Sequence, residues 1–225
     1  MRLVLIDKKS EQRNISTFIF KPEKKIKWTS GQYLIYSLPH QKNDLRGKQR
    51  FFTISSAPHQ NYPSITTRIE KKPSSFKTAL NKLKVGEEIF VKGPDGDFIL
   101  DKKSKINIFI AGGIGITPFI AILRDLVFKK MKNEVLLLYA NKNNNILFKK
   151  ELDKISKKNK NIQIKYFIGS AKIDKNVLKR VIKKNIDIFI SGPDPMVAKM
   201  EETVKKLGVK EENIKLDYFS GYKNI

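Results

Sequence analysis

The sequence predicts two domains, an N-terminal antiparallel β-barrel over residues 1–100 and a C-terminal α/β domain with an open parallel sheet over residues 101–225. Three observations predict this fold class. Short strand-like segments separated by turn residues fill the first hundred residues, as in barrels and sandwiches. Apolar runs of strand length then alternate with helical patterns, which implies parallel βαβ units. A polar stretch at residues 98–105 separates the two patterns.

Six strands and one helix are expected in the N-terminal domain. The strands are residues 3–6, 16–20, 33–38, 50–55, 65–69 and 88–92. The helix covers residues 75–83, with Ser74 or Ser75 as its N-cap, because a short hydroxyl side chain accepts a hydrogen bond from the first free amides. Phe76 and Leu80 recur at helical spacing and predict its buried face.

The C-terminal domain is expected to alternate five strands with four helices. The strands are residues 106–111, 134–139, 162–167, 186–191 and 214–219, and the helices are residues 118–130, 147–157, 175–183 and 195–207. Parallel strands joined by helices form a sheet that is covered on both faces. Ligands of such sheets bind beyond the carboxyl ends of the strands, so these ends are where candidate residues are sought.

The composition narrows the chemistry. The chain has no cysteine and two histidines, His40 and His59, so neither disulfides nor a thiolate or multi-histidine metal site is expected. Redox chemistry would therefore come from a bound organic cofactor. No apolar run approaches the roughly 18 residues that span a bilayer. The N-terminus lacks a secretory signal, so we expect a cytoplasmic protein without stable membrane insertion.

The net charge of +24 raises the alternative of a nucleic-acid-binding protein, because dense Lys and Arg neutralise phosphates. The 39 lysines among the 46 basic residues are scattered along the chain, however, and most are typical of solvated faces. They are not interleaved with aromatic residues in one patch. We therefore expect no nucleic-acid partner and favour electrostatic steering of an acidic protein partner.

A glycine-rich turn links a predicted strand to the helix that starts at Pro118. Gly112, Gly113 and Gly115 would let the backbone approach a bound phosphate, and amides at a helix start favour negative charge. Thr117 is expected to be the N-cap or a phosphate contact, and Pro118 suits the first helical position. The spacing matches neither the Gly-x-Gly-x-x-Gly fingerprint nor a Walker loop. The alternative is a tight turn required only for packing.

The segment Arg50-Phe51-Phe52-Thr53 is a second candidate. On a strand, Arg50 and Phe52 point to one face and Thr53 points to the other. A cation, a flat aromatic ring and a hydroxyl group could hold a phosphate, a ring system and a ring nitrogen. An aromatic pair on a strand is otherwise typical of a packed core.

Two further strand ends are expected to share a crevice with the glycine-rich turn. Ser191, Gly192, Pro193 and Met196 lie where a strand passes through a glycine turn into a helix. Asn141 follows the end of another strand. Three strand ends that converge on one crevice are stronger evidence for a ligand site than any one of them.

In order and spacing, these motifs resemble those of the ferredoxin–NADP reductase family, and the resemblance runs nearly end to end. The family's flavin motif, Arg-x-Tyr/Phe-Ser/Thr, corresponds to Arg50, Phe52 and Thr53. Its nicotinamide motif, Gly-Gly-x-Gly-x-Thr/Ser-Pro, corresponds to residues 112–118. Its Cys/Ser-Gly-Pro-x-x-Met motif corresponds to residues 191–196.

The resemblance implies an FAD-binding barrel followed by a nicotinamide-binding domain. It implies that Arg50 contacts the FAD pyrophosphate, that Phe52 stacks on the isoalloxazine and that Thr53 forms a hydrogen bond near N5. Thr67 and Arg68 match the strand that lies along the ribityl chain and the adenylate.

Some positions depart from the family's pattern. Lys77, with Thr78 beside it, stands where a hydroxyl residue is usual; a lysine can still meet a pyrophosphate as a point charge, but FMN stays open as an alternative to FAD. Ser191 replaces a frequent cysteine and could orient the nicotinamide ring. Phe219 or Tyr222 would shield the flavin until the nicotinamide displaces it, unless they only pack the last strand. Thr53, Ser191 and Phe219 are the candidate catalytic residues.

The implied activity moves electrons between NADPH or NADH and a separate acceptor, by hydride transfer through the N5 atom of FAD. Ferredoxin or flavodoxin is the favoured acceptor, because both are usually acidic and this chain is basic. An NAD(P)H:flavin reductase of the same fold is the nearest alternative, and a basic nucleic-acid-binding protein is a more distant one. Asn141, Lys142 and Lys172 are candidate contacts of a 2′-phosphate, which leaves the choice between NADPH and NADH open.

Overall fold

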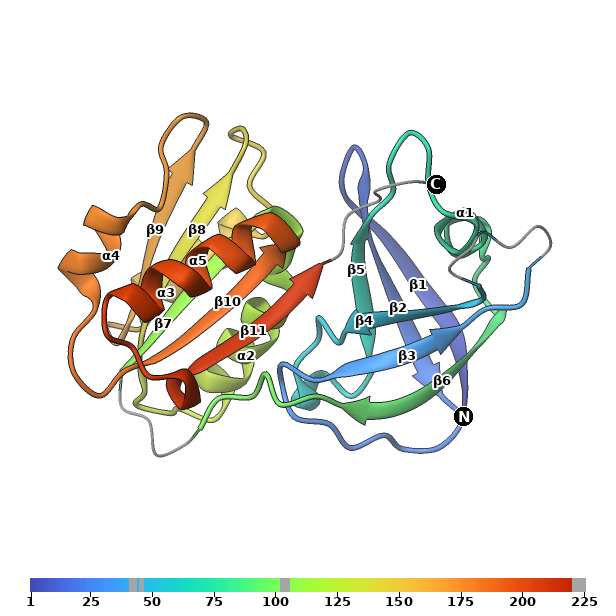
Figure 1. Ribbon diagram of the computed structural model, residues 1–225. Coiled ribbons are helices and arrows are strands. Elements are labelled where there is room, and N and C mark those ends of the chain that lie inside the picture. The colour runs from blue at the N-terminus through green and yellow to red at the C-terminus, as the bar shows by residue number, and fades with distance from the viewer. Residues whose placement is uncertain (41–43, 45–46, 102–105, 220–225) are drawn as a thin grey trace. The chain divides into compact units, whose positions relative to one another are not determined.

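The computed structural model describes residues 1–40, 44, 47–101 and 106–219 (Figure 1). The chain forms two compact units, one of which covers Met1–Ile99 and the other of which begins at Leu100. Within the described ranges, none of the helices combines the length and the apolar character that crossing a bilayer requires.

The first unit is a curled antiparallel sheet. Its strands are β1 (Arg2–Gln12), β2 (Ile15–Pro22), β3 (Tyr33–Ser37), β4 (Gln49–Thr53), β5 (Ser64–Arg68) and β6 (Glu88–Asp95). They are hydrogen-bonded in the order β4-β3-β6-β1-β2-β5. Just past the end of β4, the amide of Ser55 donates to the carbonyl of Ser64 on β5, so the two outer strands approach each other. This arrangement confirms the predicted antiparallel barrel domain.

Apolar side chains fill the inside of the sheet, and the helix α1 (Ser75–Lys82) packs against them. Phe76 and Leu80 of this helix are fully buried in the same core as Leu34 of β3. The hydroxyl group of Ser74 accepts a hydrogen bond from the amide of Lys77, so Ser74 is the N-cap.

Strand β1 is longer than the apolar pattern of residues 3–6 predicts. Its second half is polar and mostly exposed, yet it continues to pair with β2 in a hairpin as far as Gln12. The register shifts between Leu5 and Asp7, where the strand leaves the core. Backbone pairing rather than side-chain burial holds this half, which is why the apolar alternation stops before the strand does.

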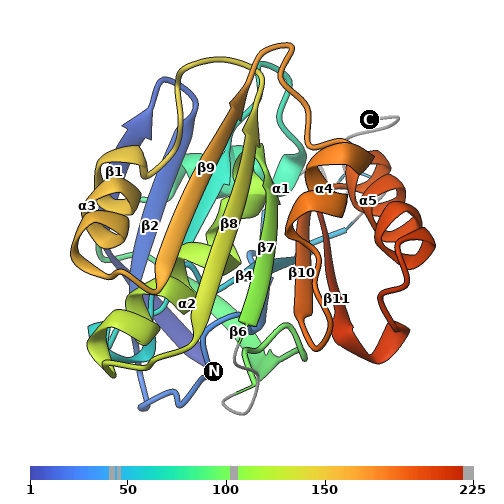
Figure 2. The same ribbon diagram turned by 90° about the vertical axis from the view of Figure 1, so that its left-hand side faces the viewer.

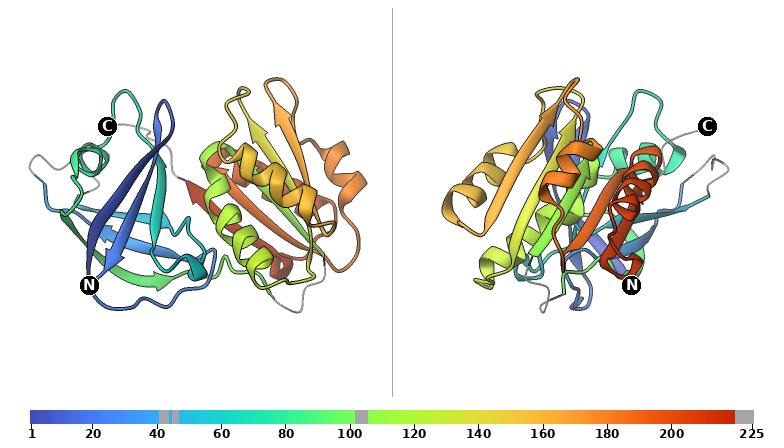
Figure 3. Two further views of the ribbon diagram at one scale, coloured as in Figure 1. Left: turned by 180° about the vertical axis from the view of Figure 1, so that it is seen from behind. Right: turned by 60° about the vertical axis from the view of Figure 1, so that its left-hand side comes forward.

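The second unit is a parallel sheet with helices on both faces. Its strands are β7 (Ile106–Gly112), β8 (Glu134–Asn141), β9 (Ile162–Ile168), β10 (Asp187–Pro193) and β11 (Ile214–Phe219), in the order β11-β10-β7-β8-β9. Its helices are α2 (Thr117–Phe128), α3 (Lys149–Lys158), α4 (Lys175–Val181) and α5 (Asp194–Lys206). Helices α2 and α3 cover one face of the sheet, and α4 and α5 cover the other (Figures 1 and 3). The predicted α/β domain is confirmed.

Both faces of this sheet are apolar, as the nearly continuous apolar runs of its strands predict. On one face, Ile110 and Ile190 pack in a cluster with Val197 of α5. On the other face, the ring of Phe109 stacks on that of Phe119 of α2, with 4.8 Å between the ring centroids. Burial on both faces makes the positions of the strand ends rigid, and these ends carry the candidate residues.

Candidate functional site

Strand β4 places Arg50 and Phe52 on the same face. Arg50 lies opposite Tyr36 and Phe52 lies opposite Leu34 on β3, and both of these partners are fully buried. The ring of Phe52 is partly buried between Tyr36 and Phe76, with centroid distances of 5.8 and 5.9 Å. Phe52 therefore has the flat apolar surroundings that a stacked ring requires, although part of its surface already contacts protein.

The two neighbours of Phe52 lie on the opposite face of β4. Thr53 is opposite Tyr33 and is 7% exposed. Phe51 is 65% exposed, and its ring meets that of Tyr33 edge to face, with 5.5 Å between the centroids. The sequence pattern selected Phe52 by its spacing from Arg50, whereas the more exposed aromatic ring of the strand is Phe51.

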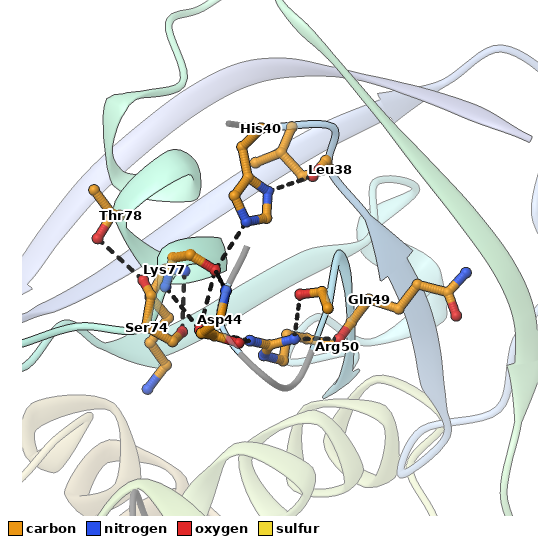
Figure 4. A network of polar contacts seen from close by, with 10 residues as sticks. Leu38, His40, Asp44, Gln49, Arg50, Ser74, Lys77 and Thr78 are labelled. Atoms are coloured by element: carbon orange, nitrogen blue, oxygen red, sulfur yellow. Dashed lines mark hydrogen bonds and ion pairs between the residues drawn. The ribbon is translucent and has the colours of Figure 1, made fainter. Parts of the chain in front are cut away.

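Arg50 is held by a group of polar contacts shown in Figure 4. Its Nη2 donates to both carboxylate oxygens of Asp44, at 2.9 and 3.2 Å. Its Nη1 donates to the carbonyls of Gly47 and Gln49, at 2.9 and 2.7 Å. The side chains of Arg50 and Asp44 are each 13% exposed, so this ion pair is shielded from water.

The first turn of α1 completes the same group. The amide and the hydroxyl group of Ser75 both donate to Oδ2 of Asp44, at 2.9 and 3.0 Å. We call Arg50, Asp44 and Ser75 the barrel cradle. A guanidinium group and an amide of the first helical turn that converge on one anion make a site suited to phosphate. No signal in the sequence singled out Asp44, because a lone acidic residue in a connection between strands has no distinctive spacing.

Lys77 and Thr78 of α1 have partners within the first unit. Nζ of Lys77 forms an ion pair with Glu70 at 3.3 Å, and the Lys77 side chain is 14% exposed. The hydroxyl group of Thr78 donates to the carbonyl of Ser74 at 3.0 Å. Lys77 therefore provides a second, partly neutralised positive charge on the helix that carries the barrel cradle, while the hydroxyl of Thr78 bonds to the helix backbone.

Strand β5 carries the two other flavin candidates. Thr67 is buried, and Arg68 lies at the end of the strand opposite Ile15 of β2. The Nε atom of Arg68 is buried and has no hydrogen-bond partner among the described residues. A buried cationic donor without a partner is costly, and a bound ligand with acceptor atoms would satisfy it.

In the second unit, the carboxyl ends of β8, β7 and β10 lie side by side (Figure 2). Gly112 on β7 pairs with Ala140 on β8, and Ala111 pairs with Ser191 on β10. The structure thus brings together the candidates that the sequence placed at three strand ends. We call this group, which comprises Gly112, Gly113, Gly115, Asn141 and Ser191 to Met196, the strand-end site.

Three glycines of the strand-end site are required by close packing. A Cβ atom on Gly115 would lie 2.3 Å from the carbonyl oxygen of Ser191, and one on Gly112 would lie 2.3 Å from the sulfur of Met196. A Cβ atom on Gly192 would lie 2.9 Å from the terminal methyl group of Met196. Close packing of β7 and the turn after it against β10 and the start of α5 therefore explains these positions without a ligand, which is the alternative that the sequence left open.

Gly113 differs from these glycines. Its φ is +55°, a conformation that L-residues rarely adopt, and a Cβ atom there would meet nothing within 4 Å. The hydroxyl group of Tyr139 holds this turn by donating to the carbonyl of Gly113 at 2.9 Å. The backbone at Gly113 is therefore open to a close approach by a ligand, and packing does not account for it.

Thr117 was expected to be either the N-cap of α2 or a phosphate contact, and it is not the N-cap. A 3₁₀ turn, Gly113–Ile116, separates β7 from α2, and Thr117 is already the first residue of the helix. Its hydroxyl group donates to the carbonyl of Ile114 at 3.2 Å, and the residue is 2% exposed. The 3₁₀ turn shifts the helix start by one residue, so the N-cap is Ile116, whose side chain makes no cap bond. Pro118 does occupy the first turn, as predicted.

Polar atoms at the strand ends differ in whether they have partners. The hydroxyl group of Ser191 is buried and donates to Oδ2 of Asp217 on β11 at 3.2 Å. The buried Nδ2 of Asn141 and Oδ1 of Asp194 have no hydrogen-bond partner among the described residues. Asn141 thus offers a free donor at the end of β8, where a ligand with acceptor oxygens would satisfy it.

The last described residues lie at the end of β11. Phe219 pairs with Pro193 of β10, so it stands at the carboxyl edge of the sheet. The hydroxyl group of Tyr218 donates to Glu201 of α5 at 3.0 Å; burial and this hydrogen bond raise the pKa of Tyr218 above its usual value. Tyr222, the other candidate shield, lies outside the described residues.

The described residues fit the cofactors that the family resemblance implies. In the first unit, the barrel cradle gathers donors for a pyrophosphate, and Arg68 has an orphaned donor. In the second unit, Gly113 leaves the backbone open and Asn141 has an orphaned donor. Both sets match anionic, oxygen-rich ligands such as dinucleotides.

Comparison with known families agrees with this assignment. A family model described as an oxidoreductase FAD-binding domain matches residues 2–99, and one described as an oxidoreductase NAD-binding domain matches residues 109–202. The chain is a ferredoxin–NADP reductase-like flavoprotein. Its cofactors are FAD and a nicotinamide nucleotide, and it is an oxidoreductase.

Two curated relatives match nearly the whole of this flavoprotein. Flavohemoprotein A of Dictyostelium discoideum is 28% identical over 244 residues, which cover 100% of this chain and 62% of the relative. NADH-cytochrome b5 reductase 1 of Coccidioides immitis is 26% identical over 236 residues, which cover 94% of this chain and 76% of the relative. The flavoprotein thus spans about 60% of the length of the flavohemoprotein.

Solved structures share the fold. The flavohaem-like FAD/NAD-binding domain of nitric oxide dioxygenase from Vibrio cholerae has a TM-score of 0.83 at 20% identity and covers 98% of both chains. The ferredoxin-NADP⁺ reductase from Plasmodium falciparum has a TM-score of 0.80 at 19% identity and covers 97% of this chain and 95% of its own.

Proposed function

We propose that this cytoplasmic flavoprotein takes reducing equivalents from NADPH or NADH onto FAD and delivers them to a protein acceptor. Residues 1–100 would form the FAD domain and residues 101–225 the nucleotide domain. The observation that carries the proposal is the barrel cradle, in which Arg50 and the first amide of α1 converge on one anion. The second unit adds an open glycine turn at the end of β7.

FAD supplies the chemistry when bound, because its isoalloxazine accepts a hydride from a nicotinamide and gives up electrons singly or in pairs. The chain's own residues bind and orient it. Arg50 and Ser75 hold the pyrophosphate, Arg68 satisfies its Nε on the ligand, and Phe52 supplies an aromatic face. Thr53, which is buried on the opposite face of β4, supplies a hydroxyl group for the ring edge in this proposal.

The strand-end site binds the nicotinamide nucleotide in this proposal. Gly113 admits the nucleotide's phosphates to the backbone, and Asn141 donates to its oxygens. Ser191, held by Asp217, fixes the edge of the site where a nicotinamide ring is oriented. Phe219, at the end of β11, is proposed to shield the flavin ring from water until the nicotinamide displaces it.

The acceptor is a redox protein with an acidic surface. A net charge of +24 raises the encounter rate with an acidic partner at low ionic strength, and ferredoxin and flavodoxin carry such surfaces. A haem protein is a second candidate acceptor. It is favoured by the names of two relatives, a flavohemoprotein and an NADH-cytochrome b5 reductase, because each name refers to a haem protein.

Acceptor reduction tests the proposal. The protein reconstituted with FAD is mixed with NADH or NADPH and with a flavodoxin, a ferredoxin or cytochrome b5, and the reduction rate of each acceptor is measured at low and high salt. We expect reduction of at least one acceptor with one nucleotide, and a rate that falls as salt screens the charges. Failure of all three acceptors, with free flavin reduced instead, would support the NAD(P)H:flavin reductase alternative.

A further inference from the structure

The barrel cradle already contains an anion, and this anion belongs to the chain itself. The carboxylate of Asp44 accepts hydrogen bonds from Nη2 of Arg50 and from the amide of Ser75, at 2.9 Å each (Figure 4). These are the donors that the proposed function assigns to the FAD pyrophosphate. We propose that Asp44 competes with the FAD pyrophosphate for the cradle and thereby weakens the retention of FAD. This inference rests on the proposed function.

The contacts of Asp44 are those of a bound anion. From the described residues, four donor contacts reach its two oxygens: two from Nη2 of Arg50 and two from the amide and hydroxyl groups of Ser75. The side chain is 13% exposed, so water screens the ion pair little. A phosphate group that entered the cradle would meet a second negative charge at hydrogen-bond distance, and both anions would not share the same donors.

The cradle does not need Asp44 to keep its shape. Nη1 of Arg50 donates to the carbonyls of Gly47 and Gln49, which fix the guanidinium group independently of Asp44. Helix α1 is capped by Ser74 rather than by Asp44. The side chain of Ser75 also contacts Nε2 of His40 at 2.9 Å, so it keeps a partner without Asp44. Removal of the Asp44 charge should therefore release donors rather than dismantle them.

The effect of such competition on FAD affinity follows from the fraction of molecules in which the cradle is free. The apparent Kd equals the intrinsic Kd divided by that fraction, so a cradle that Asp44 occupies in about 90% of molecules has a Kd about tenfold above its intrinsic value. A weakly retained flavin would dissociate during purification, and the protein would be recovered partly without its cofactor.

The test compares FAD affinity in the full-length protein and its variants by quenching of flavin fluorescence. Asp44→Asn removes the charge at nearly constant volume and should lower the Kd for FAD about tenfold. Glu23→Gln is the matched control: Glu23 also forms a two-contact pair with an arginine, Arg2, on the surface of the same unit, away from any helix start. Glu23→Gln should leave the Kd within about twofold of the wild-type value.

Two ligands without a complete FAD separate competition from a general change in the protein. Riboflavin has no phosphate, so its affinity should be the same in Asp44→Asn and in the wild type. Inorganic pyrophosphate should raise the thermal midpoint of apo Asp44→Asn more than that of the apo wild type, because it occupies the vacated cradle.

An FAD affinity of Asp44→Asn equal to or weaker than the wild-type affinity overturns the inference. Asp44→Ala is the second variant, and if neither variant folds, Asp44 holds the cradle together and the inference is also wrong. Failure of the proposed function looks different. If FAD bound to the wild type is not bleached by NADH or NADPH, the proposed function fails whatever the affinity ratio of the variants. If the flavin bleaches normally and Asp44→Asn binds FAD with the same affinity as the wild type, only the role of Asp44 is rejected.

Discussion

The barrel cradle and the strand-end site are both suited to the phosphates of a dinucleotide, but they achieve this by different physics. The cradle uses charge, since Arg50 and a helix amide converge on one point that the carboxylate of Asp44 already fills. The strand-end site has no basic side chain among its defining residues and uses backbone approach instead. A Cβ atom on Gly113 would meet nothing within 4 Å, and Gly112 and Gly115 let neighbouring segments pack closely. In a charged site, an acidic residue of the protein can therefore compete with the ligand for the same donors, whereas the geometry of a backbone site is determined by packing.

Substitution of the strand-end glycines by alanine should give the largest loss of stability among the tests of this contrast. Gly115→Ala puts a Cβ atom 2.3 Å from the carbonyl oxygen of Ser191 and should lower the free energy of unfolding by about 3 kcal/mol or more. Gly113→Ala meets no atom within 4 Å and should cost only about 1 kcal/mol, from the strain of a positive φ. Urea unfolding of the two variants measures both values.

Equal losses of stability in Gly113→Ala and Gly115→Ala would contradict the division of the glycine motif into packing and ligand-facing positions. A second readout sharpens the comparison. Gly113→Ala should weaken nucleotide binding more than its small loss of stability explains, because the added methyl group projects into the space that the nucleotide's phosphates require.

The barrel cradle should show its dependence on charge through Arg50. Arg50→Ala removes the charge-assisted hydrogen bonds and should raise the Kd for FAD about 30-fold, which corresponds to about 2 kcal/mol. Arg50→Lys keeps the charge without the planar guanidinium group, so its Kd for FAD should lie between those of the wild type and Arg50→Ala. Fluorescence titration with FAD gives the three values, and an Arg50→Ala affinity within about twofold of the wild type would remove Arg50 from the site.

Ser191 connects the strand-end site to the edge strand. Ser191→Ala deletes the buried hydrogen bond to Asp217 and should lower the free energy of unfolding by about 1 kcal/mol. If the residue also orients the nicotinamide, kcat/KM for the nucleotide should fall by more than the fraction of unfolded protein explains. Ser191→Cys, which has the family's more frequent side chain, should recover most of kcat/KM. A Ser191→Ala variant with reduced stability and normal kcat/KM would leave Ser191 a structural role only.

Asp153 offers the smallest effect and an exposed counterpart to Asp44. It bonds to Lys149 at 2.6 Å and accepts from Tyr166 at 2.7 Å, but its side chain is 47% exposed. Burial acts to raise the pKa of Asp153, and the hydrogen bonds from Lys149 and Tyr166 outweigh it, so the pKa is lowered.

A lowered pKa in the folded state contributes stability above the usual pKa of the carboxyl group, and this contribution is lost as the pH falls through the folded pKa. Asp153→Asn should therefore reduce stability by less than about 0.5 kcal/mol at about pH 6, because solvent screens an exposed pair. The difference between the variant and the wild type should shrink toward about pH 3. Urea unfolding at both pH values checks the sign, and a difference that grows on acidification would refute it.

The fold could be predicted from the sequence because the spacing of apolar residues and the positions of turn residues are local signals. Apolar runs of strand length and helical patterns predicted the five parallel strands, and the glycine-rich turn marked the carboxyl end of β7. The polar half of β1 was missed, since backbone pairing without burial leaves no apolar period.

The candidate site was less accessible from sequence. Motif spacing selected Arg50, Gly113 and Asn141, but it gave no separation between glycines needed for packing and the glycine that faces open space. It could not find Asp44, whose contact with Ser75 joins residues that are 31 positions apart in the chain. Long-range side-chain contacts of this kind depend on the fold and carry no local pattern.

One measurement tests the central claim most directly. The protein is reconstituted with FAD, passed through a desalting column and mixed with NADH or NADPH without oxygen and without any acceptor, while the visible flavin band is recorded. The claim predicts that part of the flavin leaves the column with the protein, at less than full occupancy, and that its band bleaches with at least one nucleotide. A flavin that stays bound and keeps its full colour with both nucleotides would contradict it.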